Sequence, residues 1–284
     1  ITTNMSALAT LASIVAVGAT PVLVDVNPDM LANLDLIKKN INEKTKAVIY
    51  VHLYGDSSNA TDVETLCNDN NIDLIEDCAQ SAGSKCGDSY AGSIGKISAF
   101  SFYPTKNLAS IGDGGAILTS DRNLYKKVKE IRQYGWDDSR VPQTIGINSR
   151  LDEIQAKFLN IKLEHLEFFL NERKKIASFY ISKLNDKFDI ITKKNNIPYH
   201  LFVLRVNNRD QLISKLKKKN INLGIHYAQV FSKTNFYNNY CKVRCDLANS
   251  ENFANQVVTL PIYPGLGHDD QALICDLLLD SKIT

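Results

Sequence analysis

The sequence predicts an α/β fold in which helices sandwich a mainly parallel central sheet, followed by a smaller C-terminal α+β domain. Over the first half of the chain, runs rich in β-branched residues alternate with helical patterns, which is typical of βαβ units. Beyond about residue 186 this alternation gives way to shorter elements. The length of 284 residues is sufficient for one large domain and one small one.

The large domain is expected to span residues 1–150. Its first elements are a helix over residues 7–17, which Gly18 ends, and a buried strand over residues 20–26. The elements that follow are a helix at 34–41, a strand at 46–55 closed by glycine, a helix at 59–70, strands at 72–77, 97–103 and 115–120, and a helix at 121–133. Ligands of parallel α/β sheets gather at the carboxyl ends of the strands, so the residues just after these strands are candidates for a site.

The second half of the chain begins with a helical spacing of apolar residues. This spacing predicts one long helix over residues 151–186, which links the two domains. The small domain, residues 187–284, is expected to contain a strand at 200–206, a helix at 209–219 and a short strand at 224–227.

Two polar residues lie at strand ends of the large domain. Asp77 ends the strand at 72–77, and Lys106 follows the strand at 97–103. An amine and a carboxylate at one sheet edge suit pyridoxal 5′-phosphate, because the amine forms a Schiff base with the aldehyde and the carboxylate pairs with the pyridinium nitrogen. The alternative is a solvated surface lysine and a strand-end turn residue.

Composition excludes several classes of function. The net charge is +2, and the densest basic run, at 214–220, coincides with the end of a predicted helix, where lysines suit the helix dipole. We therefore expect a solvated helix end and no nucleic-acid partner. No apolar stretch reaches the ~20 residues that span a bilayer, so no membrane partner is expected.

Six cysteines are present, but their spacing does not complete a zinc-binding set. We expect no metal, and we expect reduced thiols in a cytoplasmic protein. The glycines at 112, 114 and 115 do not have the spacing of a nicotinamide-binding fingerprint.

Four segments in order, 77–80, 100–106, 112–115 and 148–156, resemble the sugar aminotransferases of the DegT/DnrJ/StrS family. The resemblance implies a pyridoxal-phosphate-dependent transferase of fold type I that aminates nucleotide-linked keto-sugars. Residues 1–150 would then be the cofactor-binding domain. The family's dehydratases carry histidine where Lys106 stands, which favours an aminotransferase.

The same resemblance implies roles for individual residues. Lys106 resembles the Schiff-base lysine and proton carrier, and Asp77 resembles the partner of the pyridine nitrogen. Ala79 resembles the residue packed on the ring face, and Gln80 the residue beside the ring hydroxyl. Ser101 resembles a phosphate ligand.

Other residues are expected to act across an interface or on the substrate. Asn148 resembles the residue that reaches the phosphate of the neighbouring subunit's cofactor, which implies a homodimer with a shared active site. His226 and Tyr227 resemble the family's substrate-binding pair. The open alternative is that they are strand residues of the small domain with no chemical role. For His52 and Tyr54, structural packing is the better interpretation.

The expected reaction moves an amino group from an amino acid, glutamate, to a keto-sugar. The segment 148–156 followed by Lys162 is most similar to 3-aminotransferases that act on dTDP-3-keto-6-deoxyhexoses. Amination at C4 and a non-catalytic, cofactor-binding relative or inactive fragment are the alternatives. Products of such enzymes enter lipopolysaccharide, S-layer glycans or antibiotics.

The sequence departs from the family pattern near its start. The family's phosphate-binding turn, which precedes the first strand seen here, is absent, and Ala7 stands where an aromatic residue commonly stacks on the cofactor ring. We therefore expect that an N-terminal segment is missing and that a chain starting at Ile1 binds the cofactor poorly.

Overall fold

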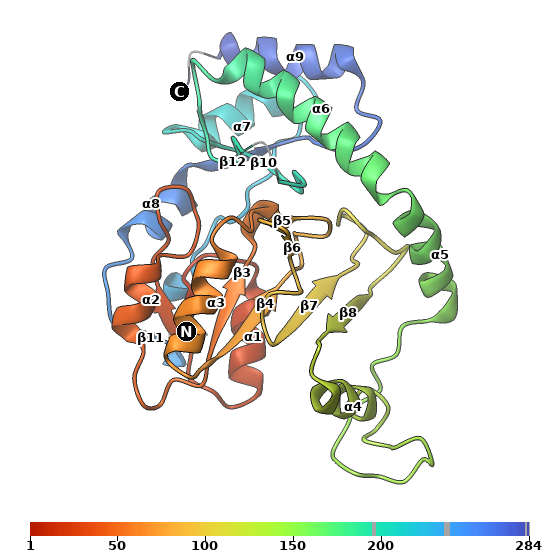
Figure 1. Ribbon diagram of the computed structural model, residues 1–284. Coiled ribbons are helices and arrows are strands. Elements are labelled where there is room, and N and C mark those ends of the chain that lie inside the picture. The colour runs from red at the N-terminus through yellow and green to blue at the C-terminus, as the bar shows by residue number, and fades with distance from the viewer. Residues whose placement is uncertain (195–196, 236–238, 282, 284) are drawn as a thin grey trace.

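A computed structural model describes residues 1–194, 197–235, 239–281 and 283 (Figure 1). Its central sheet has the strand order β3-β4-β7-β8. β3 (Ala47–Val51), β4 (Asp73–Asp77) and β7 (Ile97–Ser101) are parallel, whereas β8 (Gly115–Leu118) is antiparallel to β7. The main strand pattern predicted from the sequence is therefore present.

A second, all-parallel sheet of three short strands continues the first. It consists of β1 (Thr2–Thr3), β2 (Val22–Val24) and β11 (Lys242–Val243). The Ile49 N–H donates to the carbonyl oxygen of Ile1 at 2.9 Å, which joins β3 to the start of the chain. The remaining short elements of this half are the hairpin strands β5 (Lys85–Cys86) and β6 (Ser89–Tyr90) and the 3₁₀ turn η1 (Leu53–Gly55).

Helices α2 (Leu34–Asn40) and α3 (Ala60–Asp69) cover one face of the central sheet (Figure 1). Their apolar side chains pack with those of β3 and β4 in a single buried cluster. α1 (Leu8–Ala16) reaches the end of β4 through a hydrogen bond from Thr10 to Asp77. α4 (Arg122–Ile131) follows β8 and buries none of its residues.

The linking segment differs from the single long helix predicted over residues 151–186. Two helices, α5 (Glu153–Glu164) and α6 (Leu166–Leu184), meet at His165. The backbone of His165 has φ −107° and ψ 6°, which lies outside the α-helical region and ends α5. In Figure 1 the two helices rise in succession along one side of the molecule, from near α4 toward α9.

The C-terminal part contains an antiparallel sheet of order β12-β10-β9. The predicted strand at 224–227 is only an isolated bridge between Gly224 and Thr259. Helix α6 packs with α7 and α9 around this sheet in the largest apolar cluster of the described chain. The elements are β9 (Asp189–Ile190), β10 (Phe202–Arg205), α7 (Arg209–Lys217), η2 (Phe231–Lys233), α8 (Ala248–Gln256), β12 (Val257–Leu260) and α9 (His268–Leu279).

Within the described ranges, no helix combines the length and apolar character that crossing a bilayer requires. The six cysteines, all of which are described, are free thiols.

Candidate active site

The end of β4 directs two adjacent acidic side chains to opposite faces of the sheet, because successive residues of a strand alternate. Glu76 points into the core on the α3 face, and its side chain is fully buried. Asp77 points to the other face and is half-buried. The Thr10 hydroxyl donates to Asp77 Oδ2 at 2.7 Å, and the Ala79 N–H donates to Oδ1 at 3.1 Å. The Asp77 carboxylate is therefore held in a defined orientation.

Lys106 lies in the turn that follows β7, the strand next to β4. Its backbone N–H donates to the Tyr103 carbonyl at 2.9 Å. Burial lowers the pKa of the Lys106 amine, and the nearby Asp77 carboxylate raises it part of the way back. Among the described residues, the amine has no hydrogen-bonding or ion-pair partner. The structure thus brings Lys106 and Asp77 together at one edge of the sheet.

Lys106 lines a cavity of about 820 Å³ that lies between this edge and the C-terminal sheet. Gln80, His226 and Tyr227 also line it. The Gln80 amide links two elements, because its Oε1 accepts from the Tyr54 N–H at 2.6 Å and its Nε2 donates to the Tyr227 hydroxyl at 2.8 Å. The cavity has a size that is ordinary for small-molecule sites.

The His226–Tyr227 pair is joined by a cis peptide bond. His226 Nδ1 lies 2.9 Å from Thr259 Oγ1, and the Tyr54 hydroxyl donates to the His226 carbonyl. Burial lowers the pKa of His226, and the charge of Lys106 lowers it further. Burial raises the pKa of Tyr227 to about 12, with a further contribution from Asp77.

The family model for DegT/DnrJ/EryC1/StrS aminotransferases matches residues 1–279. This chain belongs to the DegT/DnrJ/EryC1/StrS aminotransferase family. The fold-type I architecture predicted from the sequence is confirmed by its structural relatives. Members of the family depend on pyridoxal 5′-phosphate, as the sequence also predicted.

Three known proteins illustrate the relationship. The chain is 34% identical over 281 residues to a dTDP-3-amino-3,4,6-trideoxy-alpha-D-glucose transaminase from Micromonospora megalomicea subsp. nigra, covering 95% of this chain and 75% of the relative. It is 33% identical over 276 residues to a UDP-N-acetyl-3-dehydro-alpha-D-glucosamine 3-aminotransferase from Acidithiobacillus ferrooxidans, covering 95% and 74%. The structure of S. venezuelae DesV in complex with a ketimine intermediate matches with a TM-score of 0.93 at 32% identity, over 99% of this chain and 77% of that one.

The residues around Lys106 fit the cofactor of this family. An amine without a partner among the described residues faces a cavity, and a carboxylate fixed by two donors lies close to it. Ala79 is half-buried beside that carboxylate. Ser101, at the end of β7, lies on the same sheet face as Asp77, because Ala99 is the β7 partner of Asp77 and Ser101 is two residues further along. Ser101 is not among the described residues that line the cavity.

Asn148 lies away from the cavity of its own chain. It is exposed in the segment between α4 and α5, where it forms an isolated bridge with Gln133 and accepts a hydrogen bond from Arg150 Nε at 2.9 Å. Figure 1 shows this segment projecting beyond α4 from the body of the molecule. The structure of one chain therefore does not bring Asn148 to Lys106.

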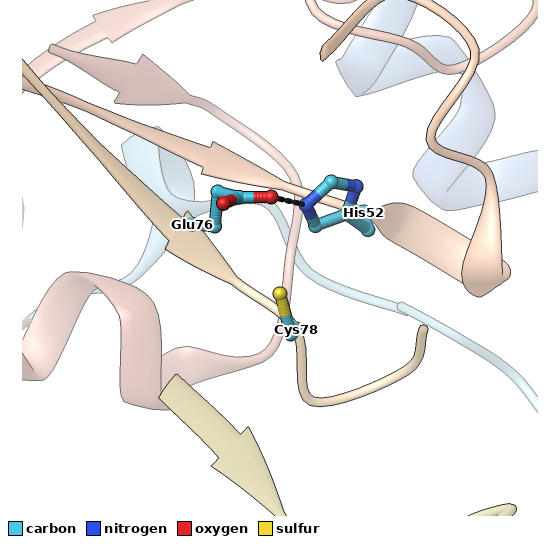
Figure 2. Close-up of side chains that lie close together, drawn as sticks. All are labelled: His52, Glu76 and Cys78. Carbon is cyan, nitrogen blue, oxygen red and sulfur yellow. Dashed lines mark hydrogen bonds and ion pairs between the residues drawn. The ribbon is translucent and has the colours of Figure 1, made fainter. Parts of the chain in front are cut away.

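Behind Asp77, His52, Glu76 and Cys78 form a buried cluster whose ligand-type atoms lie within 4.8 Å of one another (Figure 2). The Glu76 carboxylate already accepts four N–H groups, from His52 Nε2 at 2.9 Å and from the backbone of residues 92, 94 and 95 at 2.6–2.9 Å. Burial alone would raise the pKa of Glu76, but these hydrogen bonds outweigh it and lower the pKa. All the acceptor positions of the carboxylate are thus used, and the cluster fastens the turn before β7 to β4.

Sequence reasoning missed three residues of this site. Thr10 gives no sequence signal, because it is one more small residue in an apolar helix. His200 is 6% exposed, and its Nδ1 lies 3.3 Å from Asn107 Oδ1. Arg173 interrupts the apolar face of α6, and that interruption is a signal that a helical wheel could have revealed.

Proposed function

We propose that this enzyme transfers an amino group from glutamate to a nucleotide-linked keto-sugar, specifically a dTDP-3-keto-6-deoxyhexose. The observation that carries the proposal is the proximity of Asp77 to Lys106, whose side chain lines a cavity that suits a small molecule. The names of both curated relatives place the amino group at C3, and one of these relatives acts on a dTDP-linked sugar. These names favour C3 over C4.

Pyridoxal phosphate, when bound, supplies an electrophilic aldehyde and an electron sink for the carbon that loses a proton. Lys106 is the residue that holds the aldehyde carbon. Its Nζ also moves the proton at the substrate carbon that bears nitrogen. The lowered pKa of this amine increases the fraction of free base near neutral pH, which a general base requires.

The other proposed roles concern binding and orientation. Asp77, held by Thr10, fixes the pyridine nitrogen and keeps it protonated. Ala79, Gln80 and Ser101 complete the cofactor site. His226 and Tyr227 face the same cavity, where they orient the sugar.

We also propose that two chains form a homodimer in which Asn148 of one chain binds the cofactor phosphate of the other. Support comes from the apolar surface around it. Ile145 is 93% exposed and Ile147 is 61% exposed, and α4 buries none of its residues. Two strongly exposed isoleucines so close to Asn148 favour an interface at this segment.

A hybrid of two inactive variants tests the shared site. In a mixture of Asn148→Ala and Lys106→Ala chains, each hybrid dimer regains one site with both residues intact. If subunits exchange at random, about a quarter of the wild-type activity returns. No recovery in a mixture that demonstrably exchanges subunits would place Asn148 outside the partner's site.

The substrate proposal is tested with glutamate and a panel of 3-keto and 4-keto dTDP- and UDP-sugars, with the aminated product read by mass. We expect dTDP-3-keto-6-deoxyhexoses to react fastest. Faster amination of 4-keto-sugars would assign the enzyme to C4. Cofactor binding without any change in absorbance on adding glutamate would identify a non-catalytic relative.

A further inference from the structure

Arg173 occupies a position where the helix pattern calls for an apolar residue. It lies on the buried face of α6 between Leu170 and Ala177, and only 7% of it is exposed. Burial alone lowers the pKa of its guanidinium to about 10, so no carboxylate among the described residues compensates for the lost hydration. A buried charge without a counter-charge lowers the stability of the folded protein unless a ligand or another group supplies that counter-charge.

One end of the guanidinium is fixed by the backbone of the C-terminal part. Nη1 donates to the carbonyl oxygens of Tyr199, His200 and Ile262, at 3.2, 3.3 and 2.8 Å. Among the residues that the structure describes, Nε and Nη2 have no acceptor. Since Arg173 lines the cavity, this edge of two parallel donors is pre-organised and available to a ligand.

The cavity around this edge is basic. Five of the described residues that line it are basic and none is acidic. Burial first, and next the charges of Lys106 and Arg173, hold the pKa of His200 well below its usual value. His200 is therefore neutral at physiological pH. The basic lining residues are Lys106, Lys162, Arg173, His200 and His226.

We propose that the Nε–Nη2 edge of Arg173 binds the side-chain carboxylate of the acidic amino donor, while the donor's amine lies toward the aldehyde carbon that Lys106 would hold. A carboxylate offers two coplanar oxygens, which match the two parallel N–H groups of a guanidinium edge. The charge of the ligand supplies the counter-charge that Arg173 lacks in the described chain. The inference rests on the proposed transamination and adds to it a residue that selects dicarboxylic over neutral donors.

The test uses Arg173→Gln, Arg173→Lys and a control, Lys175→Gln, which removes an exposed cation of the same helix that pairs with Glu172 and does not line the cavity. Glutarate and, in a separate experiment, dTDP are titrated calorimetrically against each protein, which requires no turnover. The apparent KM values for glutamate and for its neutral analogue glutamine are then measured from the absorbance change of the cofactor. Thermal melts show whether each variant is folded.

Arg173→Gln removes the buried partner of the ligand's carboxylate. We therefore expect it to weaken glutarate binding and to raise the KM for glutamate, each by at least ~30-fold. The KM for glutamine should change by less than about threefold, since glutamine keeps the α-carboxylate but lacks the side-chain carboxylate. Arg173→Lys, which keeps the charge but not the paired donors, should be intermediate. Lys175→Gln should remain within about threefold of wild type.

Equal losses for glutamate and glutamine in Arg173→Gln would overturn the proposal, because they would show that Arg173 does not recognise the side-chain carboxylate. Unchanged glutarate binding would also overturn the proposal, as would a loss confined to titrations with dTDP, which would assign the edge to the nucleotide phosphates. Failure of every amino acid to alter the cofactor absorbance would refute the proposed transamination. The glutarate titration would still report on Arg173 in that case.

Discussion

Replacing Thr10 with valine tests how Asp77 is oriented. Thr10 is 3% exposed, and its hydroxyl donates to Asp77 Oδ2 at 2.7 Å while lying 3.1 Å from the Ser6 hydroxyl. A hydrogen bond to a charged group contributes about 1.5–3 kcal/mol, and water cannot replace the donor at this depth. If the whole of this energy is lost from the stabilisation of the transition state, kcat/KM should fall about 10- to 150-fold.

The assay is the glutamate half-reaction, followed by cofactor absorbance, with the cofactor dissociation constant measured in parallel. Thr10→Ser keeps the hydroxyl and should retain most of the activity. Ser13→Ala is the matched control, because Ser13 is on the same helix but its hydroxyl donates only to the Thr10 carbonyl, at 2.9 Å. Wild-type kcat/KM in Thr10→Val, with only a lower melting temperature, would refute the orienting role.

Three further predictions follow from the site. Lys106→Ala should lose both the yellow colour of the bound cofactor and all turnover, a loss far beyond the ~10²–10⁴-fold that proton transfer contributes. An absorbance spectrum and a turnover assay check this prediction, and a yellow, active variant would contradict it. Glu76→Gln should lower the free energy of unfolding by about 3–5 kcal/mol, because an amide cannot accept four N–H groups. Urea titration measures this free energy. The control is Asp73→Asn, because the half-exposed ion pair of Asp73 on the same strand should contribute less than about 1 kcal/mol. The pKa of His200 is lower in the folded protein than its ordinary 6.5, so the unfolded state binds the proton first as the pH falls. The free energy of unfolding should therefore decrease below pH 6.5 by up to about 1.4 kcal/mol per pH unit. His200→Gln should reduce that slope, and an unchanged slope would contradict the assignment.

The arrangement of the central strands could be predicted from the sequence because local patterns determine it. The runs at 46–55, 72–77 and 97–103 each contain several apolar residues, and residues at or after the ends of the last two meet in space. Their limits could not be predicted as well. β3 ends at Val51 because the chain turns sharply afterwards, and Gly55 has φ +96°, where an added Cβ would lie 2.6 Å from Pro198 Cγ. That contact with a distant segment leaves no local signal.

The break between α5 and α6 has a similar origin. Apolar spacing continues across His165, so a periodic pattern predicts one helix. The first helix carries a single buried residue, Leu159, whereas the second packs along the C-terminal sheet. The direction of each helix is set by a different part of the fold, and the sequence at the junction does not encode that difference.

For the candidate site, the sequence singled out Lys106, Asp77, Gln80 and Tyr227, but not Thr10 or Arg173 and not the contacts that hold these side chains in place. Lys106 and Asp77 lie at strand ends, where the pattern of a parallel sheet places ligands. Thr10, Gln80 with Tyr227, and Arg173 act through contacts between segments far apart in the chain. Such contacts depend on tertiary packing, and residue type alone does not reveal them.

Reductive trapping of the cofactor tests the central claim most directly. The protein is incubated with pyridoxal 5′-phosphate, reduced with borohydride and digested, and the peptides are analysed by mass. We predict that the added pyridoxyl mass is found on the peptide that contains Lys106, at that residue. Stable labelling of a different lysine, with Lys106 unmodified, would contradict the account.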